Sequence, residues 1–158
     1  MYTTKARDIM TRTVVTIRED QTLAEAARLM LNRKVSCLPV LDRAGDLVGI
    51  LTHTDFTAQR RHLPFSDTPV LALLGGLTSF REIAEAYRDA GALPVAQVMK
   101  RKLITAAPDT PVGEIVEKMV QHEIKRVPVV DAGKLVGIIS RHDLLKLVAD
   151  RRPSARSA

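Results

Sequence analysis

One sequence motif occurs twice in this chain of 158 residues. Gly49–Asp55 reads Gly-Ile-Leu-Thr-His-Thr-Asp, and Gly137–Asp143 reads Gly-Ile-Ile-Ser-Arg-His-Asp. Each copy follows a Pro-Val step, at Pro39 and at Pro128. An internal repeat constrains the fold before any single residue does, because related units bury matching apolar faces against each other. We therefore expect two related units that are packed together, with a ligand-binding cleft between them.

The repeat extends over most of each half of the chain. Met10 aligns with Met99 at an offset of 89 residues (99 − 10), and the same offset aligns Pro39 with Pro128. The offset falls to 88 (137 − 49) after the turn at Gly45, where the second copy is one residue shorter. These limits predict a first repeat at 7–57, a helical insert at 58–95, a second repeat at 96–148 and a basic, disordered tail at 149–158.

Each repeat predicts a β-α-β-β-α order of elements. β-Branched runs at 14–17 and 103–105 predict the first strands, and two hairpins are expected at 37–41 with 47–51 and at 126–130 with 134–139. A second helix is expected to begin at Thr52 and at Ser140. The predicted fold class is α+β: two repeats packed sheet to sheet, because a single three-stranded unit is marginal by itself.

The long helix of each repeat has its own start signal and apolar face. Thr22 with Glu25 predicts a capping box, whereas Thr110 is expected to be the second N-cap, with Pro111 in the first helical position. The two faces recur at helical spacing: Leu23, Ala26, Ala27 and Met30 in the first repeat, and Val112, Ile115, Val116 and Met119 in the second. In the insert, Thr68 and Ser79 predict the starts of two further helices.

Composition limits the kinds of protein that fit this chain. Hydrophobic residues make up 46%, enough for a core, and a single cysteine, Cys37, excludes an intrachain disulfide or a Cys-rich metal site. The four histidines lack metal-ligand spacing, so we expect no metal. The chain starts without a signal-peptide core and contains no run of about 20 apolar residues. These features predict a cytoplasmic protein that does not enter a membrane.

The net charge of +6 favours anionic partners such as nucleotides, although a merely basic surface remains an equal alternative. The small basic clusters lie at 60–62, 100–102 and 151–156. The repeats also differ in charge: Lys125 and Arg126 replace Ser36 and Cys37 of the first copy. Either this pair gives the second repeat phosphate-binding capacity, or it is a solvated strand end.

The repeated Pro-Val step, the Gly-Ile pair and the Ser/Thr-x-x-Asp ending resemble the cystathionine-β-synthase-type (CBS) domain, and two in tandem resemble a Bateman module. The resemblance covers about 7–56 and 96–146. It implies a regulatory fold that binds AMP, ADP, ATP or S-adenosylmethionine between the repeats. It also implies that Asp55 and Asp143 take the ribose hydroxyls, and that Thr52 and Ser140 face the phosphate.

The resemblance implies further site residues around these four. The strand threonines would lie near the base or the phosphates, and the residues before each proline would line the adenine slot. The full expected set is Thr16, Val35, Cys37, Pro39, Thr52, His53 and Asp55 in the first repeat, and Thr105, Ile124, Lys125, Arg126, Pro128, Ser140, Arg141, His142 and Asp143 in the second.

A structural interpretation of the same motif stays open. Ser/Thr-x-x-Asp also stabilises a helix start by capping, a role compatible with ligand binding. Cys37 equally fits a small buried apolar residue.

Two functions, from different classes of protein, are consistent with these features of the sequence. The first is a non-catalytic module that senses an adenosine nucleotide and signals to a separate enzyme or transporter, as a homodimer with Met30, Leu31 and Met119 near the subunit contact. The alternative is a nucleic-acid-binding protein that uses its basic clusters, which the shortage of stacking aromatics disfavours.

Overall fold

The computed structural model describes residues 4–58 and 88–149. The chain forms two compact units: unit 1 contains residues 1–14 and 104–158, and unit 2 contains residues 15–103. The helices expected to begin at Thr68 and Ser79, and the tail beyond residue 149, lie outside the described residues.

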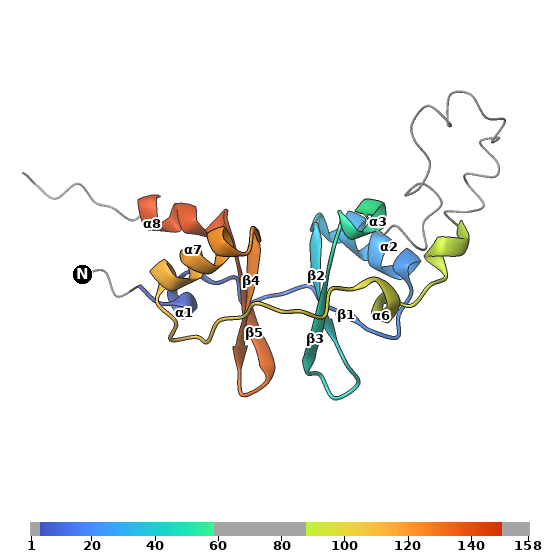
Figure 1. Ribbon diagram of the computed structural model, residues 1–158, viewed down its shortest axis with the longest axis horizontal. Helices are drawn as coiled ribbons and strands as arrows, with labels where there is room; N and C mark the ends of the chain where they lie inside the picture. Colours follow the sequence, from blue (N-terminus) through green and yellow to red (C-terminus); the bar gives the residue numbers. More distant parts are fainter. Residues whose placement is uncertain (1–3, 59–87, 150–158) are drawn as a thin grey trace, which may run out of the picture. The chain divides into compact units, whose positions relative to one another are not determined.

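Unit 2 contains a three-stranded sheet with helices beside it (Figure 1). Its elements are β1 (Ile17–Arg18), α2 (Leu23–Arg33), β2 (Cys37–Leu41), β3 (Leu47–Thr52), α3 (Asp55–Ala58) and α6 (Val95–Val98). β2 lies in the middle of the sheet, parallel to β1 and antiparallel to β3. The core contains Leu23, Ala26 and Met30 from α2, packed with Leu38, Val40 and Leu51 from the sheet.

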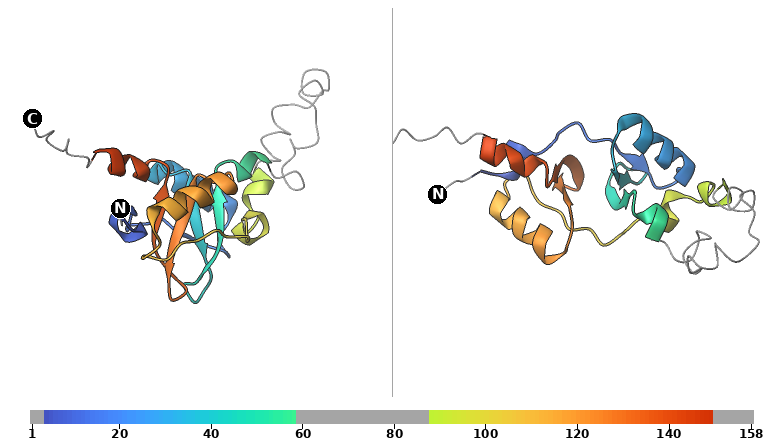
Figure 2. Two further views of the ribbon diagram at one scale, coloured as in Figure 1. Left: turned by 60° about the vertical axis from the view of Figure 1, so that its left-hand side comes forward. Right: turned by 90° about the horizontal axis from the view of Figure 1, so that it is seen from above.

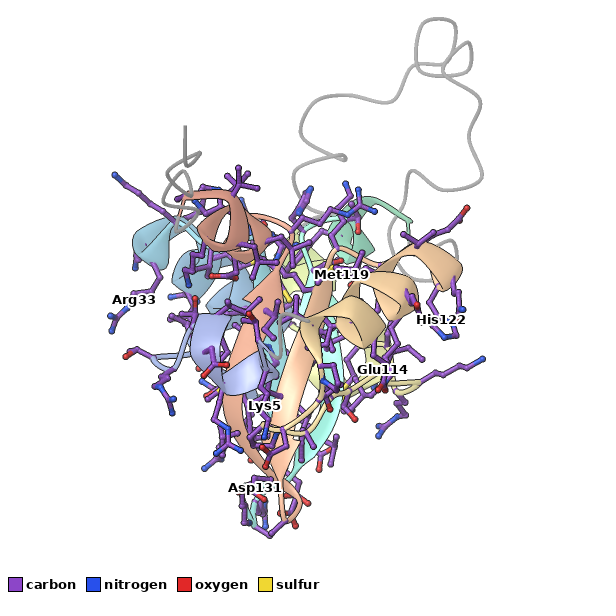
Figure 3. The ribbon with its side chains drawn as sticks, turned by 90° about the vertical axis from the view of Figure 1, so that its left-hand side faces the viewer. Lys5, Arg33, Glu114, Met119, His122 and Asp131 are labelled. Atoms are coloured by element: carbon purple, nitrogen blue, oxygen red, sulfur yellow. The ribbon has the colours of Figure 1, made fainter. Side chains whose placement is uncertain are left out.

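Unit 1 has the same plan with a shorter sheet. Its elements are α1 (Ala6–Ile9), α7 (Val112–Gln121), β4 (Arg126–Asp131), β5 (Lys134–Ser140), the 3₁₀ helix η1 (Asp143–Leu145) and α8 (Lys146–Ala149). A single parallel bridge from Ala106 to Val129 stands where unit 2 has β1. Figure 3 shows Met119 on α7, where it is 2% exposed, and Asp131 at the hairpin end of β4.

The compact units and the sequence repeats divide the chain differently, because each repeat's first segment packs with the other repeat. Helix α1 lies among the elements of unit 1 (Figure 2), and Thr11 forms an antiparallel bridge with Ile138 of β5. In unit 2, Lys100 follows α6 and forms the equivalent bridge with Ile50 of β3. Residues near the start of each repeat, such as Thr11 and Lys100, are therefore placed to reach the motif of the other repeat.

The two long helices begin in different ways. The capping box predicted at Thr22 is confirmed: Glu25 N–H donates to the Thr22 hydroxyl at 3.2 Å, and Thr22 N–H donates to the Glu25 carboxylate at 2.7 Å. The cap predicted at Thr110 is wrong, because Pro111 is the N-cap of α7. The Thr110 hydroxyl instead accepts from Ala107 N–H at 2.9 Å.

The predicted α+β class and both hairpins are confirmed, to within a residue of their expected ends. The first strands predicted at 14–17 and 103–105 are largely wrong: only Ile17 of the first range lies in β1, and 103–105 forms no strand, the next residue, Ala106, making a single bridge with Val129. The start predicted for the second helix is also wrong. Thr52 and Ser140 are the last residues of β3 and β5, and the helices begin three residues later, at Asp55 and Asp143.

Candidate functional site

The motif of unit 2 forms a tight turn that buries a carboxylate. Asp55 is only 2% exposed, although it directly follows a surface turn. Its Oδ2 accepts from the backbone N–H of Thr52 at 2.7 Å and from the Thr52 hydroxyl at 2.8 Å. The hydroxyl of Thr54 lies 2.8 Å from the same Thr52 hydroxyl. The turn thus fixes one carboxylate oxygen and holds the other, Oδ1, in a defined position.

The motif of unit 1 repeats this geometry. Asp143 is 6% exposed, and its Oδ2 accepts from the backbone N–H and the hydroxyl of Ser140, both at 2.8 Å. The structural role of the Ser/Thr-x-x-Asp pattern is therefore real in both units. It also leaves Oδ1 of each aspartate available to other groups. A carboxylate fixed in this way can accept hydrogen bonds from a pair of vicinal hydroxyls.

Three residues that the sequence analysis did not predict contact the second carboxylate oxygen. In unit 2, Lys100 Nζ lies 3.2 Å from Asp55 Oδ1. In unit 1, Asp143 Oδ1 accepts from the Thr11 hydroxyl at 3.2 Å and from Lys146 Nζ at 2.8 Å.

Two sequence signals could have indicated these contacts. Thr11 and Lys100 each follow an aligned methionine, so they occupy equivalent positions in the repeat. Lys146 lies at i+3 from Asp143, where helical side chains meet.

The electrostatics of Asp143 combine opposing effects. Burial acts to raise the pKa of this carboxyl, whereas hydrogen bonds from Lys146 and Ser140 and the lysine charge lower it. The net effect is a pKa below the ordinary value, so Asp143 stays ionised at neutral pH. An ionised carboxylate is the form that accepts hydrogen bonds from neutral hydroxyls.

The strand residues expected at the site lie beside these turns. His53 N–H donates to the carbonyl of Ser36 at 3.0 Å, and Arg141 N–H donates to the carbonyl of Lys125 at 3.1 Å. These bonds place the start of β2 beside the turn of Asp55 and the start of β4 beside the turn of Asp143. Cys37 pairs in register with Thr52, as Arg126 does with Ser140.

The expected site residues differ in exposure. The exposed ones are His53, Lys125, Arg141 and His142. The half-buried ones are Thr16, Val35, Thr105, Ile124 and Arg126, and the buried ones are Cys37, Pro39 and Pro128. Thr16 and Thr105 lie one residue before the segments that pair with β2 and β4, and thus outside the two turns. Cys37 is a buried thiol in the strand, as its apolar interpretation predicts.

Neither a metal cluster nor a membrane-spanning helix is found in residues 4–58 and 88–149. Within these ranges, no three histidine, cysteine, aspartate or glutamate side chains are grouped closely enough to hold a metal ion. No helix in the same ranges has the length and apolar character needed to cross a bilayer.

A two-unit α+β fold, with the same buried aspartate turn in each unit, is the arrangement of one small domain present in two copies. The family model described as "CBS domain" matches residues 6–61 and 95–150. The chain therefore belongs to the CBS domain family, with two copies in tandem, as the resemblance indicated.

Known proteins resemble this chain over most of its length. CBS domain-containing protein YhcV of Bacillus subtilis is 33% identical over 138 residues, which are 87% of this chain and 81% of YhcV. The CBS domain of a CBS domain-containing membrane protein from Sphaerobacter thermophilus has a TM-score of 0.71 at 40% identity, covering 90% of this chain and 86% of that one.

A further solved structure contains ligands. The CBS domain pair of protein MJ0100, in complex with 5′-methylthioadenosine and S-adenosyl-L-methionine, has a TM-score of 0.68 at 27% identity. The similarity covers 96% of this chain and all of that domain pair, at 100%.

Proposed function

We propose that this protein is a regulatory module that binds an adenosine-containing ligand and transmits its binding to a separate partner protein. The candidate ligands are AMP, ADP, ATP and S-adenosylmethionine, and the partner is an enzyme or a transporter. The observation that carries this proposal is the matching pair of carboxylates, Asp55 and Asp143, each buried and fixed through Oδ2 by the turn of its own motif.

This geometry suits recognition better than catalysis. A fixed, ionised carboxylate can accept hydrogen bonds from the two hydroxyls of a ribose, and so can distinguish a ribose from a deoxyribose. The solved domain pair of MJ0100, which binds two adenosine compounds, supports the same ligand class for this chain. Ligand binding shifts a partner only if the ligand has different affinity for two states of the module, so the partner must distinguish those states.

Isothermal titration calorimetry on the full chain tests the proposal. The panel contains AMP, ADP, ATP, S-adenosylmethionine, NADH and a single-stranded oligonucleotide, the last for the nucleic-acid alternative. We expect binding to at least one adenosine compound, and 2′-deoxyadenosine nucleotides should bind more weakly. The double variant Asp55→Ala/Asp143→Ala should lose about ten- to a hundred-fold in affinity, the effect of losing a charge-assisted hydrogen bond.

A matched control separates ribose recognition from loss of surface charge. Asp131→Ala removes an exposed carboxylate at the hairpin end of β4 (Figure 3) and should leave affinity unchanged. If the wild-type chain binds only the oligonucleotide, or if the double variant binds adenosine ligands normally, the proposal fails.

A further inference from the structure

The two aspartates differ in how many hydrogen bonds they already accept. An ionised carboxylate offers about four acceptor positions on its two oxygens. In unit 1, four donors occupy Asp143: the N–H and hydroxyl of Ser140, the Thr11 hydroxyl and the Lys146 ammonium. In unit 2, the described residues supply two hydrogen-bond donors to Asp55, the N–H and hydroxyl of Thr52, and the Lys100 ammonium forms an ion pair with its second oxygen.

The two lysines are also held differently. Lys146 Nζ donates both to Asp143, at 2.8 Å, and to the carbonyl of Ile9, at 2.7 Å. This second bond anchors the ammonium to the end of α1. The ion pair of Lys100 with Asp55 is longer, at 3.2 Å, and the Lys100 side chain is 57% exposed. The backbone of Lys100 is fixed, because it exchanges two hydrogen bonds with Ile50, at 2.9 and 3.0 Å.

These differences decide which carboxylate can accept a diol. Two ribose hydroxyls need two acceptor positions. Asp55 supplies them when the exposed Lys100 ammonium alone moves away, whereas Asp143 must lose two donors, one of them anchored. We infer that Asp55 is the carboxylate that accepts the ribose, and that Lys100 is a specificity residue. Its ammonium group leaves Asp55 when the ligand binds and pairs instead with an anionic group on the ligand. This inference rests on the adenosine-binding function proposed above.

The exchange sets a preference for charged ligands. When a ribose displaces the Lys100 ammonium from Asp55, the cation stays near the site because its backbone is fixed to β3. A 5′-phosphate supplies a new anionic partner, and such charge-assisted hydrogen bonds are stronger than those between neutral groups. Adenosine supplies no such anion, and S-adenosylmethionine carries a sulfonium cation where AMP carries its 5′-phosphate. Unit 2 should therefore favour AMP over both.

Calorimetry with AMP and adenosine tests the inference on the full chain. We expect one strong site per wild-type chain. Lys100→Met keeps an apolar stem of similar length but removes the cation. It should reduce the ratio of AMP affinity to adenosine affinity by about ten-fold, the effect of one charge-assisted hydrogen bond. Lys100→Arg retains the charge and should largely restore the ratio.

Lys146→Met is the matched control, since it removes the anchored lysine from Asp143. The ratio of AMP to adenosine affinity should stay at the wild-type value, and melting temperatures check that each variant folds. Two equal sites per chain, or an unchanged ratio in Lys100→Met, would overturn the role of Lys100 while leaving adenosine binding intact. A wild-type chain that binds neither compound nor any other adenosine ligand would overturn the proposed function, and this inference with it.

Discussion

The side chain of Met99 occupies the space beside Gly49 that a larger residue at position 49 would need. A Cβ added to Gly49 would lie 2.9 Å from Met99 Cγ, closer than such atoms approach in proteins. Unit 1 repeats the relationship, because a Cβ added to Gly137 would lie 2.9 Å from Met10 Cγ. Each glycine of the repeated motif thus admits the methionine that lies near the start of the other repeat.

Alanine at either glycine should therefore destabilise its unit. We expect Gly49→Ala and Gly137→Ala each to lower the free energy of unfolding by about 1–3 kcal/mol, the usual cost of overpacking a core. Chemical denaturation measures the change. Gly113→Ala on α7 is the control, because an added Cβ there meets no atom within 4 Å. It should leave stability unchanged or raise it by about 0.5–1 kcal/mol, since glycine disfavours helix interiors. Equal effects at all three positions would contradict the packing role of the methionines.

The lowered pKa of Asp143 predicts a loss of stability in acid. A carboxyl with a folded-state pKa below its unfolded value stabilises the fold fully above the unfolded pKa, about 3.9. The contribution is lost as the pH falls from there through the lower folded pKa. We expect Asp143→Asn to be less stable than wild type at pH 7, by about 1–3 kcal/mol for the buried donors left unsatisfied.

Urea denaturation at a series of pH values measures this difference. The gap between Asp143→Asn and wild type should begin to shrink as the pH falls below about 4 and be smallest below the lower folded-state pKa, where the wild-type carboxyl has also lost its charge. Asp131→Asn, at an exposed position, should differ little from wild type throughout. A gap for Asp143→Asn that stays constant down to pH 2 would mean that the carboxylate charge does not contribute.

We also expect a homodimer that pairs through α2 and α7. Of the three residues that the sequence suggested for this contact (Met30, Leu31 and Met119), Met30 and Met119 are 7% and 2% exposed and pack within their own units. Leu31 and Val120 occupy equivalent repeat positions and are 76% and 69% exposed, so they suit the contact better. Leu31→Lys/Val120→Lys should give a monomer in light scattering at micromolar concentration. Val148→Lys, at a valine that is 70% exposed on α8, should remain a dimer. A wild-type chain that is monomeric in the same measurement would contradict the prediction of a homodimer.

Local signals in the sequence predicted most of the fold. The capping box of Thr22 and Glu25 requires only residues three apart, and both hairpins show their apolar pairing over a few residues. The contact of Thr11 with Asp143 spans 132 positions, and no local pattern encodes it. The sequence therefore indicated which carboxylates belong to the repeated turns, but the donors from the first segment of each repeat became visible only when that segment was placed in space.

The start of β4 provides the last prediction. Arg126 pairs in register with Ser140, and the carbonyl of Lys125 accepts from Arg141 N–H, so both residues lie beside the turn of Asp143. We expect Lys125→Ser/Arg126→Cys, which restores the first repeat's residues, to weaken ATP more than adenosine and to flatten the salt dependence of ATP binding. The reason is that a polyphosphate gains more from added cations than a neutral nucleoside does.

Calorimetry at low and high salt measures both effects. Lys134→Ser, which removes a lysine at the opposite end of the same hairpin, is the control for net charge and should change ATP binding little. Equal losses for ATP and adenosine in the double variant would show that Lys125 and Arg126 shape the adenine slot instead. If neither ATP nor adenosine binds more weakly to the double variant, Lys125 and Arg126 form a solvated strand end. Removing a charged pair that contacts phosphate would have weakened ATP binding.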